Sequence, residues 1–427
     1  MFSKAALAAS GAAAGAYYYW RKSTGDNAIE IDADPEAITF KTPSRQSTLA
    51  KLKSSTFDIV VIGGGATGTG CALDAASRGL RVACIEANDF ASGTSSKSTK
   101  LVHGGVRYLE KAITGFDYGQ YALVKEALEE RKLVLNLAPH LTSSLPIMLP
   151  IYGESWFSLL KVPYYYMGTK VYDLIAGLNN AGLTGSWLLS KQRAIEEFPL
   201  LRRKGLLAAL VYYDGQQDDS RMNVALALTA SRQGACVLNY VKVVGFVFNE
   251  AKEIEGAHVE DQITKERFTI KGKAFINATG PFCDDLLNMA DPEGCANKKL
   301  IKGSAGVHIV LPDYYCPKRM GLLDPATKDK RVAFFLPWMG KSLAGTTDTP
   351  QKIVSIDEEP VPKLDDIDYI LDELKDYVEV TPTRGEVKAA WAGIRPLVSP
   401  VGADPSDTAS IVRSHYIFMD PQSKLVT

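Results

Sequence analysis

A glycine-rich turn between two apolar runs constrains this chain more than any other feature. The run from Phe57 to Ile62 is β-branched, as in a buried parallel strand, and Gly63-Gly64-Gly65-Ala66-Thr67-Gly68 follows at once. In the G-x-G-x-x-G pattern the glycines allow a tight turn, close approach to a pyrophosphate, and packing of helix on strand. A second buried run, from Arg81 to Ile85, ends at Glu86, whose carboxylate can accept hydrogen bonds from both adenosine ribose hydroxyls. The pattern therefore predicts a βαβ dinucleotide-binding unit.

The turn alone does not distinguish NAD from FAD, and two further segments favour FAD. The predicted strand Ala274–Asn277 runs into Ala278-Thr279-Gly280, where a glycine suits close backbone approach to the cofactor. The run Ser92–Ser98 carries small hydroxyl residues that can bind a pyrophosphate and line a flavin, although such a run is also typical of a solvated loop. The predicted cofactor contacts are Gly63, Gly65, Ala66, Thr67, Gly68, Glu86, Ser92, Thr94, Ser95, Ser96, Gly104, Val243, Ala278, Thr279 and Gly280.

Composition excludes several other classes of protein. The chain has 427 residues, 46% of them apolar and 23% charged, as in an ordinary soluble globular protein. Forty-eight basic residues against 49 acidic ones leave a net charge of −1, which argues against a nucleic-acid partner. The six cysteines are scattered, with no C-x-x-C pair and no histidine at metal-ligand spacing. We therefore expect structural thiols and no metal site.

The N-terminus differs in character from the rest of the chain. Ala5 to Trp20 is an apolar run, flanked by Lys4 and by Arg21-Lys22 and ending in three tyrosines and a tryptophan. It is slightly shorter than the ~20 residues that span a bilayer, and its Gly11 and Gly15 suit close helix contact. A cleaved secretory signal is the alternative, but aromatics occupy the place where small residues permit cleavage. The pattern favours organelle targeting or a membrane anchor, followed by a polar linker over residues 23–55.

The remaining patterns predict an α/β fold assembled from separated segments. Helices are expected at Tyr118–Leu137 and Met222–Gln233, and strands at Val237–Val247 and Phe268–Ala278 that rejoin the first sheet. Residues 141–204 carry aromatic clusters typical of an inserted cap. Residues 300–350 alternate as in an antiparallel sheet, and 363–379 form an acidic amphipathic helix.

The predicted fold class is therefore a doubly wound Rossmann-type FAD domain with an inserted mixed α+β substrate (cap) domain. Residues 1–50 are assigned to a targeting or membrane-anchor leader and linker. Residues 51–140, 205–290 and 385–427 are assigned to the FAD domain. Residues 141–204 and 291–384 are assigned to the cap.

A series of motifs resembles the FAD-dependent glycerol-3-phosphate dehydrogenases. The first is His103-Gly104-Gly105-Val106-Arg107-Tyr108-Leu109. The others follow in family order over about residues 55–427, namely Tyr213-Asp214-Gly215, Asp218-Asp219-Ser220-Arg221-Met222, Asn277-Ala278-Thr279-Gly280-Pro281, Lys302-Gly303, His308-Ile309-Val310-Leu311-Pro312, Leu336-Pro337-Trp338, Gly345-Thr346-Thr347-Asp348 and Ala392-Gly393-Ile394-Arg395-Pro396-Leu397. The apolar leader resembles the mitochondrial branch, which passes electrons to ubiquinone at the inner membrane.

The resemblance implies oxidation of sn-glycerol 3-phosphate to dihydroxyacetone phosphate, with hydride transfer to flavin N5. Arg107 and Arg395 suit the phosphate because a guanidinium is planar and always charged. His308 and His103 are candidate catalytic bases because imidazole titrates near neutrality. The other implied substrate contacts are Tyr108, Arg413 and Thr347. The implied partners are glycerol 3-phosphate, ubiquinone and the mitochondrial inner membrane, with a homo-oligomer left open.

The sequence also departs from this family. Its members continue past the segment like Ser410–His415 into a strand, a Gly-Gly-Lys-x-Thr-Thr-Tyr-Arg turn that contributes to the flavin site, and further domains. This sequence stops at Leu425-Val426-Thr427, so we expect the chain as given to bind FAD weakly and to have little activity. Two alternatives stay open: an inactive membrane-anchored fragment or subunit, and a flavin oxidase that uses oxygen, of the glycerol-3-phosphate or amino-acid oxidase type.

Overall fold

The computed structural model describes residues 40–178, 185–291, 300–324, 327, 332–351, 355–356, 358–398 and 416–427, without the side chains of Arg107 and Lys111. The chain divides into two units, Met1–Pro43 and Ser44–Thr427, and all that follows concerns the second. The predicted leader, Arg413 and Cys295 lie outside the described residues. The cysteines within them are free thiols.

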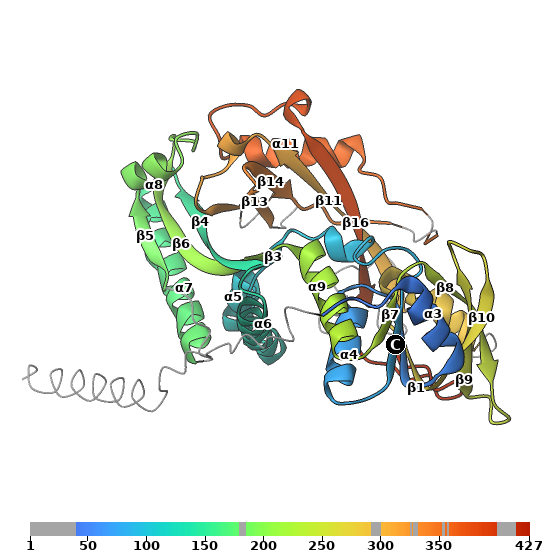
Figure 1. Ribbon diagram of the computed structural model, residues 1–427. Helices are drawn as coiled ribbons and strands as arrows, with labels where there is room; N and C mark the ends of the chain where they lie inside the picture. The colour runs from blue at the N-terminus through green and yellow to red at the C-terminus, as the bar shows by residue number, and fades with distance from the viewer. Residues whose placement is uncertain are drawn as a thin grey trace, which may run out of the picture. The chain divides into compact units, whose positions relative to one another are not determined.

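The first sheet contains the glycine-rich turn and has the strand order β7-β2-β1-β10-β9-β8 (Figure 1). The strands β7 (Cys236–Leu238), β2 (Val82–Ile85), β1 (Thr56–Ile62) and β10 (Arg267–Asn277) run parallel. The strands β9 (Ile254–Asp261) and β8 (Val241–Phe248) extend the sheet as antiparallel neighbours. The later strands rejoin the first sheet, as predicted, but the single strand expected over Val237–Val247 is wrong, because that segment forms β7 and β8 at opposite edges of the sheet.

Two helices that are distant in sequence lie side by side next to this sheet. Helix α4 (Ala66–Ser77) follows the glycine turn directly and packs against α9 (Asp219–Arg232) (Figure 1). The small residues on α4 permit this close packing, and Thr69 Oγ1 donates to Asn223 Oδ1 at 2.8 Å inside the contact. The helix predicted from Met222 begins earlier because Asp218 caps its N-terminus by accepting from the Arg221 amide.

The polar linker predicted over residues 23–55 is wrong for its last part, where the structure has helix α3 (Arg45–Ser54). Ser44 caps this helix by accepting from the Ser47 amide. Leu52 is fully buried in the core of the first sheet, and Arg45 forms an ion pair with Asp261 at 2.8 Å. These tertiary contacts stabilise a helix whose sequence lacks a strong amphipathic pattern.

The second sheet has the order β15-β11-β14-β13-β12-β4-β6-β3, with β16 paired to β11 and β5 to β6. It is antiparallel except where β12 meets β4. Its strands are β3 (Leu101–Val102), β4 (Thr142–Tyr152), β5 (Trp187–Ser190), β6 (Leu206–Gln217), β11 (Ile301–Leu311), β12 (Gly321–Asp324), β13 (Ala333–Trp338), β14 (Lys341–Gly345), β15 (Thr349–Pro350) and β16 (Ala389–Val398). The antiparallel sheet expected over 300–350 is thus part of a larger one.

Two of these strands fall outside the expected division of the chain. β6 and β16 lie in the second sheet, whereas the sequence assigned residues 205–290 and 385–427 to the FAD domain. Strand partners are set by contacts between distant segments, so the local residue pattern of β6 and β16 does not reveal which sheet they join. The domain limits themselves stay a prediction.

The remaining helices pack against the second sheet or connect it to the first, except α10, which packs on the first sheet. They are α5 (Val106–Gly115), α6 (Tyr118–Leu137), the 3-10 helix η2 (Trp156–Leu160), α7 (Lys161–Leu178), α8 (Lys191–Glu197), α10 (Cys283–Ala290) and α11 (Leu364–Lys375). The helix predicted at Tyr118–Leu137 is confirmed, because Asp117 caps it by accepting from the Gly119 and Gln120 amides. Within the described part of the chain, none of the helices combines the length and the hydropathy needed to cross a bilayer.

Candidate active site

The glycine-rich turn is shaped by backbone contacts that leave no room for side chains. Gly63 has φ +111°, and a Cβ built on it would lie 2.4 Å from the carbonyl oxygen of Ala278. A Cβ on Gly68 would lie 1.8 Å from the carbonyl oxygen of Gly63. The turn therefore requires glycine at both positions, and it brings β1, α4 and the end of β10 together.

Two polar side chains hold this turn from the neighbouring loop. Glu86, just after β2, accepts from the Gly64 amide at 2.6 Å and from the Asn88 amide at 2.8 Å. Burial raises the pKa of Glu86, and these amide donors oppose that shift. Ser95 Oγ accepts from the Ala66 amide at 2.9 Å, at the N-terminus of α4. In dinucleotide folds a pyrophosphate binds at the N-terminus of the helix after the glycine turn, where backbone amides face the ligand.

The hydroxyl-rich loop links the turn to the second sheet. Its 3-10 helix η1 (Thr94–Ser96) is held by Thr94 Oγ1, which donates to the carbonyl oxygen of Ile394 on β16 at 2.6 Å. Ser96 Oγ makes only a weak contact of 3.3 Å with the carbonyl oxygen of Gly93. Of the predicted hydroxyl contacts, Ser95 is therefore the one that the structure places against the glycine turn.

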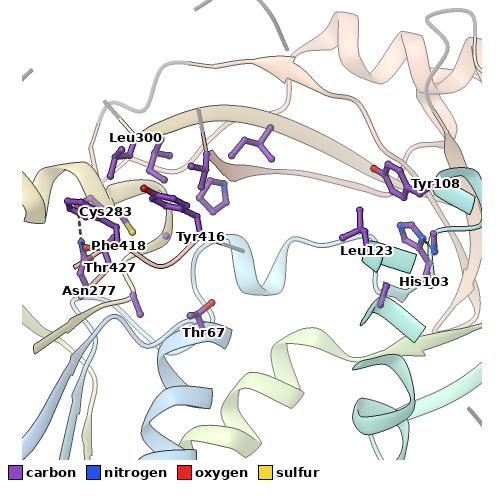
Figure 2. A pocket seen from close by; sticks show the side chains of 18 of the residues that line it. Thr67, His103, Tyr108, Leu123, Asn277, Cys283, Leu300, Tyr416, Phe418 and Thr427 are labelled. Atoms are coloured by element: carbon purple, nitrogen blue, oxygen red, sulfur yellow. Dashed lines mark hydrogen bonds between the residues drawn. The ribbon is translucent and has the colours of Figure 1, made fainter. Parts of the chain in front are cut away.

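A cavity of about 600 Å³ extends from the glycine turn to the turn at His103. Figure 2 shows His103, Tyr108 and Leu123 on one wall and Asn277, Cys283, Phe418 and Thr427 on the opposite wall, with Thr67 below them. The other lining residues are Gly104, Gly105, Val124, Ala127, Ala278, Gly280, Leu300, Ile301, Pro396, Leu397, Val398 and Tyr416. A concave, mainly apolar space of this size is typical of a cofactor or small-molecule site.

The His103 turn presents a defined tautomer to this cavity. The Gly105 amide donates to His103 Nδ1 at 3.0 Å, so the neutral ring carries its proton on Nε2. Gly105 has φ +76° and is the N-cap residue of α5, whose first turn places Tyr108 at the cavity wall. In this arrangement His103 can donate a hydrogen bond from Nε2, and it can act as a base only after the Gly105 amide releases Nδ1.

His308 and Arg395 lie together, away from the cavity lining. His308 is 2% exposed, its Nε2 is 3.0 Å from Thr99 Oγ1, and its ring stacks on Trp391 at a centroid distance of 5.9 Å. Burial, with help from the cations of Arg395 and Lys100, lowers the pKa of His308 to about 3. His308 is therefore neutral at physiological pH, and a group with this pKa is a weak general base.

Arg395 is engaged by the loop after β14. Its guanidinium donates to the Thr347 carbonyl oxygen at 3.1 Å and to Thr346 Oγ1 at 2.8 Å, and it pairs with Asp348 at 3.4 Å. Thr347 is buried, and its Oγ1 accepts from the Val307 amide. Arg395 lies closely over Gly306, where a Cβ would be 2.3 Å from a guanidinium nitrogen. The structure thus joins Arg395 and Thr347 in one cluster on the second sheet.

The other predicted site residues are distributed unevenly. Thr67, Gly104, Ala278 and Gly280 line the cavity. Val243 does not, because its side chain is buried in the core of the first sheet. Arg107 is in the first turn of α5, but its side chain, like Arg413, lies outside what the structure describes.

Two groups of residues that line the cavity were not predicted from the sequence. Leu123, Val124 and Ala127 have helical i, i+4 spacing on α6, which indicates a common face but not what it borders. Near the C-terminus, Val426 bridges Ile276 in parallel and Asn277 Nδ2 donates to Thr427 Oγ1 at 3.2 Å. No local pattern marks this pairing, because it joins segments about 150 residues apart in the chain.

Comparison with known proteins agrees with this geometry. Residues 58–419 match the family model described as FAD dependent oxidoreductase. The chain is 49% identical over 421 residues to the mitochondrial glycerol-3-phosphate dehydrogenase of Bos taurus, covering 96% of this chain and 55% of that protein. It is 47% identical over 457 residues to that of Saccharomyces cerevisiae, covering 98% of this chain and 69% of that protein.

A solved structure extends the comparison. The glycerol-3-phosphate dehydrogenase from Bacillus halodurans, complexed with FAD, superimposes with a TM-score of 0.66 at 30% identity, covering 90% of this chain and 62% of that chain. The chain spans about half the length of the bovine protein that it matches.

These matches define the class of protein. The chain belongs to the FAD-dependent oxidoreductases. Within that class it belongs to the mitochondrial glycerol-3-phosphate dehydrogenase family. The similarity to the yeast member covers 98% of this chain and 69% of the yeast protein. The resemblance carried by the motifs and the predicted fold class are thereby confirmed.

FAD is the cofactor of this class, and the residues present fit it. Gly63 and Gly68 form a cradle that any Cβ would fill, Glu86 lies at the end of β2, and Ser95 lies at the N-terminus of α4. Such a set suits a ribose and a pyrophosphate. The cavity beyond Thr67 leads from this end to the His103 turn.

Proposed function

We propose that this chain oxidises glycerol 3-phosphate to dihydroxyacetone phosphate with FAD as the immediate acceptor. The observation that carries the proposal is the cavity whose one end is the glycine turn and whose other end is the His103–Tyr108 segment. The similar bovine and yeast proteins, named as glycerol-3-phosphate dehydrogenases, support this choice of substrate. When bound, FAD would supply the oxidising power by accepting a hydride from C2 of the substrate, with the proton of the C2 hydroxyl released to solvent.

The chain's own residues bind and orient the substrate in this proposal. Arg107, Tyr108, Arg395, Arg413 and Thr347 are the proposed substrate contacts. Arg107 is carried at the N-terminus of α5, where the backbone amides also favour an anion. His103 donates from Nε2 to a substrate oxygen, since its Nδ1 is occupied by the Gly105 amide.

In this proposal His308 has a structural role and Arg395 binds the substrate phosphate. A neutral His308 holds Thr99, and through it the hydroxyl-rich loop, against β11. Arg395 reaches the site only if it exchanges contacts within the loop of Thr346 and Thr347. We propose that phosphate binding draws the guanidinium toward the substrate, because a dianion is a stronger acceptor than a carbonyl oxygen.

We further propose that the first sheet with α4 and α9 forms the cofactor domain and that the second sheet forms the substrate domain. The largely separate buried cores of the two sheets support this division, and the hydrogen bond from Thr94 to Ile394 connects them. Under this proposal β6 and β16 belong to the substrate domain, and the discontinuous limits drawn from the sequence shift accordingly.

Mitochondrial location, the inner membrane and ubiquinone complete the proposal. The names of the similar proteins support the mitochondrial location. A surface on η2 and α7 supports membrane contact, because its large apolar side chains are exposed: Trp156, Phe157, Leu160, Tyr164, Met167, Val171 and Leu174. On α7 they repeat at three- and four-residue spacing, and exposed apolar patches of this kind mark interaction surfaces. Aromatic residues are also enriched where proteins meet the membrane interface.

Anaerobic bleaching of the bound flavin tests the reaction. The purified chain is loaded with FAD and mixed with glycerol 3-phosphate, then with a soluble ubiquinone analogue or with oxygen. We expect bleaching by glycerol 3-phosphate and recovery with the quinone. Bleaching by an amino acid instead indicates an amino-acid oxidase, rapid recovery with oxygen indicates an oxidase, and bound flavin that no substrate bleaches indicates an inactive fragment.

Sedimentation with vesicles tests the membrane contact. We expect the chain to sediment with vesicles of phosphatidylcholine and cardiolipin, and Trp156→Ser with Met167→Ser to reduce the bound fraction. Ile263→Ser is the matched control, since Ile263 is similarly exposed but lies on the turn between β9 and β10. Equal loss in both variants contradicts a specific surface on η2 and α7.

A further inference from the structure

A buried polar cluster contacts the His103 turn through the backbone of Gly104. It consists of Arg131 on α6, Tyr172 on α7 and Asp214 on β6, and we call it the Asp214 cluster. Their exposed fractions are 1%, 1% and 0%. None of the three lines the cavity, so none is in a position to touch substrate or cofactor there.

One carboxylate oxygen gathers three donors. Asp214 Oδ1 accepts from Arg131 NH1 at 2.7 Å, from the Tyr172 hydroxyl at 2.9 Å and from the Gly104 amide at 3.0 Å. Burial, with the nearby Asp214 charge, raises the pKa of Tyr172 well above its usual range, so its hydroxyl stays protonated and donates. Hydrogen bonds to a buried charge are stronger than those between neutral groups, and removing one partner is costly.

The contact with Gly104 is also steric. A Cβ on Gly104 would lie 2.2 Å from the Tyr172 hydroxyl oxygen and 2.3 Å from Leu128 Cδ2. The backbone of the turn therefore rests directly on α6 and α7. The next residue, Gly105, orients the His103 ring through its amide and is the N-cap of the helix that carries Arg107 and Tyr108.

We propose that Asp214 is a positioning residue, which acts through the Gly104 amide to set the place of His103 and of the first turn of α5 at the substrate end of the cavity. Arg131 and Tyr172 hold the carboxylate in the orientation that this requires. The inference rests on the proposed function for the identity of the substrate. The hydrogen bond between the Gly104 amide and Asp214 does not depend on which substrate binds.

Tyr172→Phe tests this role with the least disturbance. It deletes the hydroxyl that donates to Asp214 and accepts from Arg131, and it opens the space beside Gly104, while the ion pair of Arg131 and Asp214 remains. Asp214→Asn is less suitable here because it leaves a buried guanidinium without its counter-charge and threatens the fold. The matched control is Tyr315→Phe, since Tyr315 is fully buried and its hydroxyl also donates to a carboxylate, that of Glu386, at 2.9 Å.

Two readouts on the full, FAD-loaded chain distinguish positioning from bulk stability. In hydrogen exchange, we expect faster exchange in residues 101–109 of Tyr172→Phe and no change in residues 56–65. In turnover, we expect the KM for glycerol 3-phosphate to rise about five- to tenfold while kcat changes by less than about twofold. Tyr315→Phe leaves both readouts as in the unchanged chain, whatever its effect on thermal stability.

Either of two results overturns the inference. One is unchanged exchange in residues 101–109 of Tyr172→Phe, and the other is a change that Tyr315→Phe reproduces in the same segment. Exchange requires no turnover, so it decides the inference even if glycerol 3-phosphate proves not to be the substrate. A chain that glycerol 3-phosphate does not bleach but that shows the exchange effect contradicts the proposed function alone.

Discussion

The two ends of the cavity hold their loops by different physical means. At the nucleotide end, Gly63 to Gly68 follow one another in sequence, and the turn is set by backbone conformation and by the absence of side chains. At the substrate end, the His103 turn is held by Asp214, 110 positions from Gly104 in the chain, and by helices α6 and α7. A contiguous motif therefore builds one end, and a buried polar cluster from distant segments builds the other.

Substitutions at the two ends of the cavity should therefore impair different properties of the protein. A change in the glycine turn should abolish cofactor binding through local geometry. A change in the Asp214 cluster should first reduce the stability of the fold and the precision of the substrate end, because the cluster is buried and lies outside the cavity lining.

The largest effect is expected from Gly68→Ala. The new Cβ would lie 1.8 Å from the Gly63 carbonyl oxygen, so the turn must move, and FAD affinity should fall by at least about a hundredfold. Fluorescence titration with FAD measures it. The control is Gly70→Ala in the same helix, which has nothing within 4 Å and should bind FAD normally. Normal FAD affinity in Gly68→Ala would show that the cradle is not the binding determinant.

Asp214→Asn should lower the free energy of unfolding by about 3–5 kcal/mol, because it leaves the buried Arg131 charge unpaired. Urea denaturation measures the loss. Asp74→Asn breaks the exposed Asp74–Arg78 pair on α4 and should have a much smaller effect, as is usual for surface ion pairs. Similar losses in the two variants would remove the distinction between the buried cluster and a surface ion pair.

His308→Gln should weaken the pH dependence of the free energy of unfolding between pH 6.5 and pH 3. The pKa of His308 is about 3 in the folded chain and 6.5 for an unperturbed histidine, so the unfolded chain binds this proton first as pH falls. Stability should therefore decrease from pH 6.5 toward pH 3, by up to about 1.4 kcal/mol per pH unit from this residue. Urea denaturation across that range should show a shallower slope for His308→Gln than for His140→Gln, which changes an exposed histidine.

Ser95→Ala should have the smallest effect, a loss of about fivefold in FAD affinity, because one hydroxyl at the N-terminus of α4 is removed. Calorimetric titration with FAD measures this change. Ser96→Ala is the control, since the Ser96 hydroxyl has only a long contact within its own loop. An equal loss in Ser96→Ala would mean that loop order, rather than the Ser95 oxygen, supports the cofactor.

The sequence by itself determined the cofactor end and the family. A tight turn that excludes Cβ atoms requires glycine, and buried parallel strands favour β-branched runs. Both patterns are contiguous, so Phe57 to Gly68 and Glu86 are recognisable from residue order alone. The helix Tyr118–Leu137 is also encoded locally, in its composition and in its Asp117 cap.

Only the tertiary structure decided the rest. It placed β6 and β16 in the second sheet and formed α3 at the end of the predicted linker. It also buried His308, a candidate base, in a stack with Trp391. It also paired Asp214 with Arg131 and joined both to Gly104. Strand pairing and buried hydrogen bonds depend on which distant segments come into contact. Residue spacing within one segment does not determine those contacts.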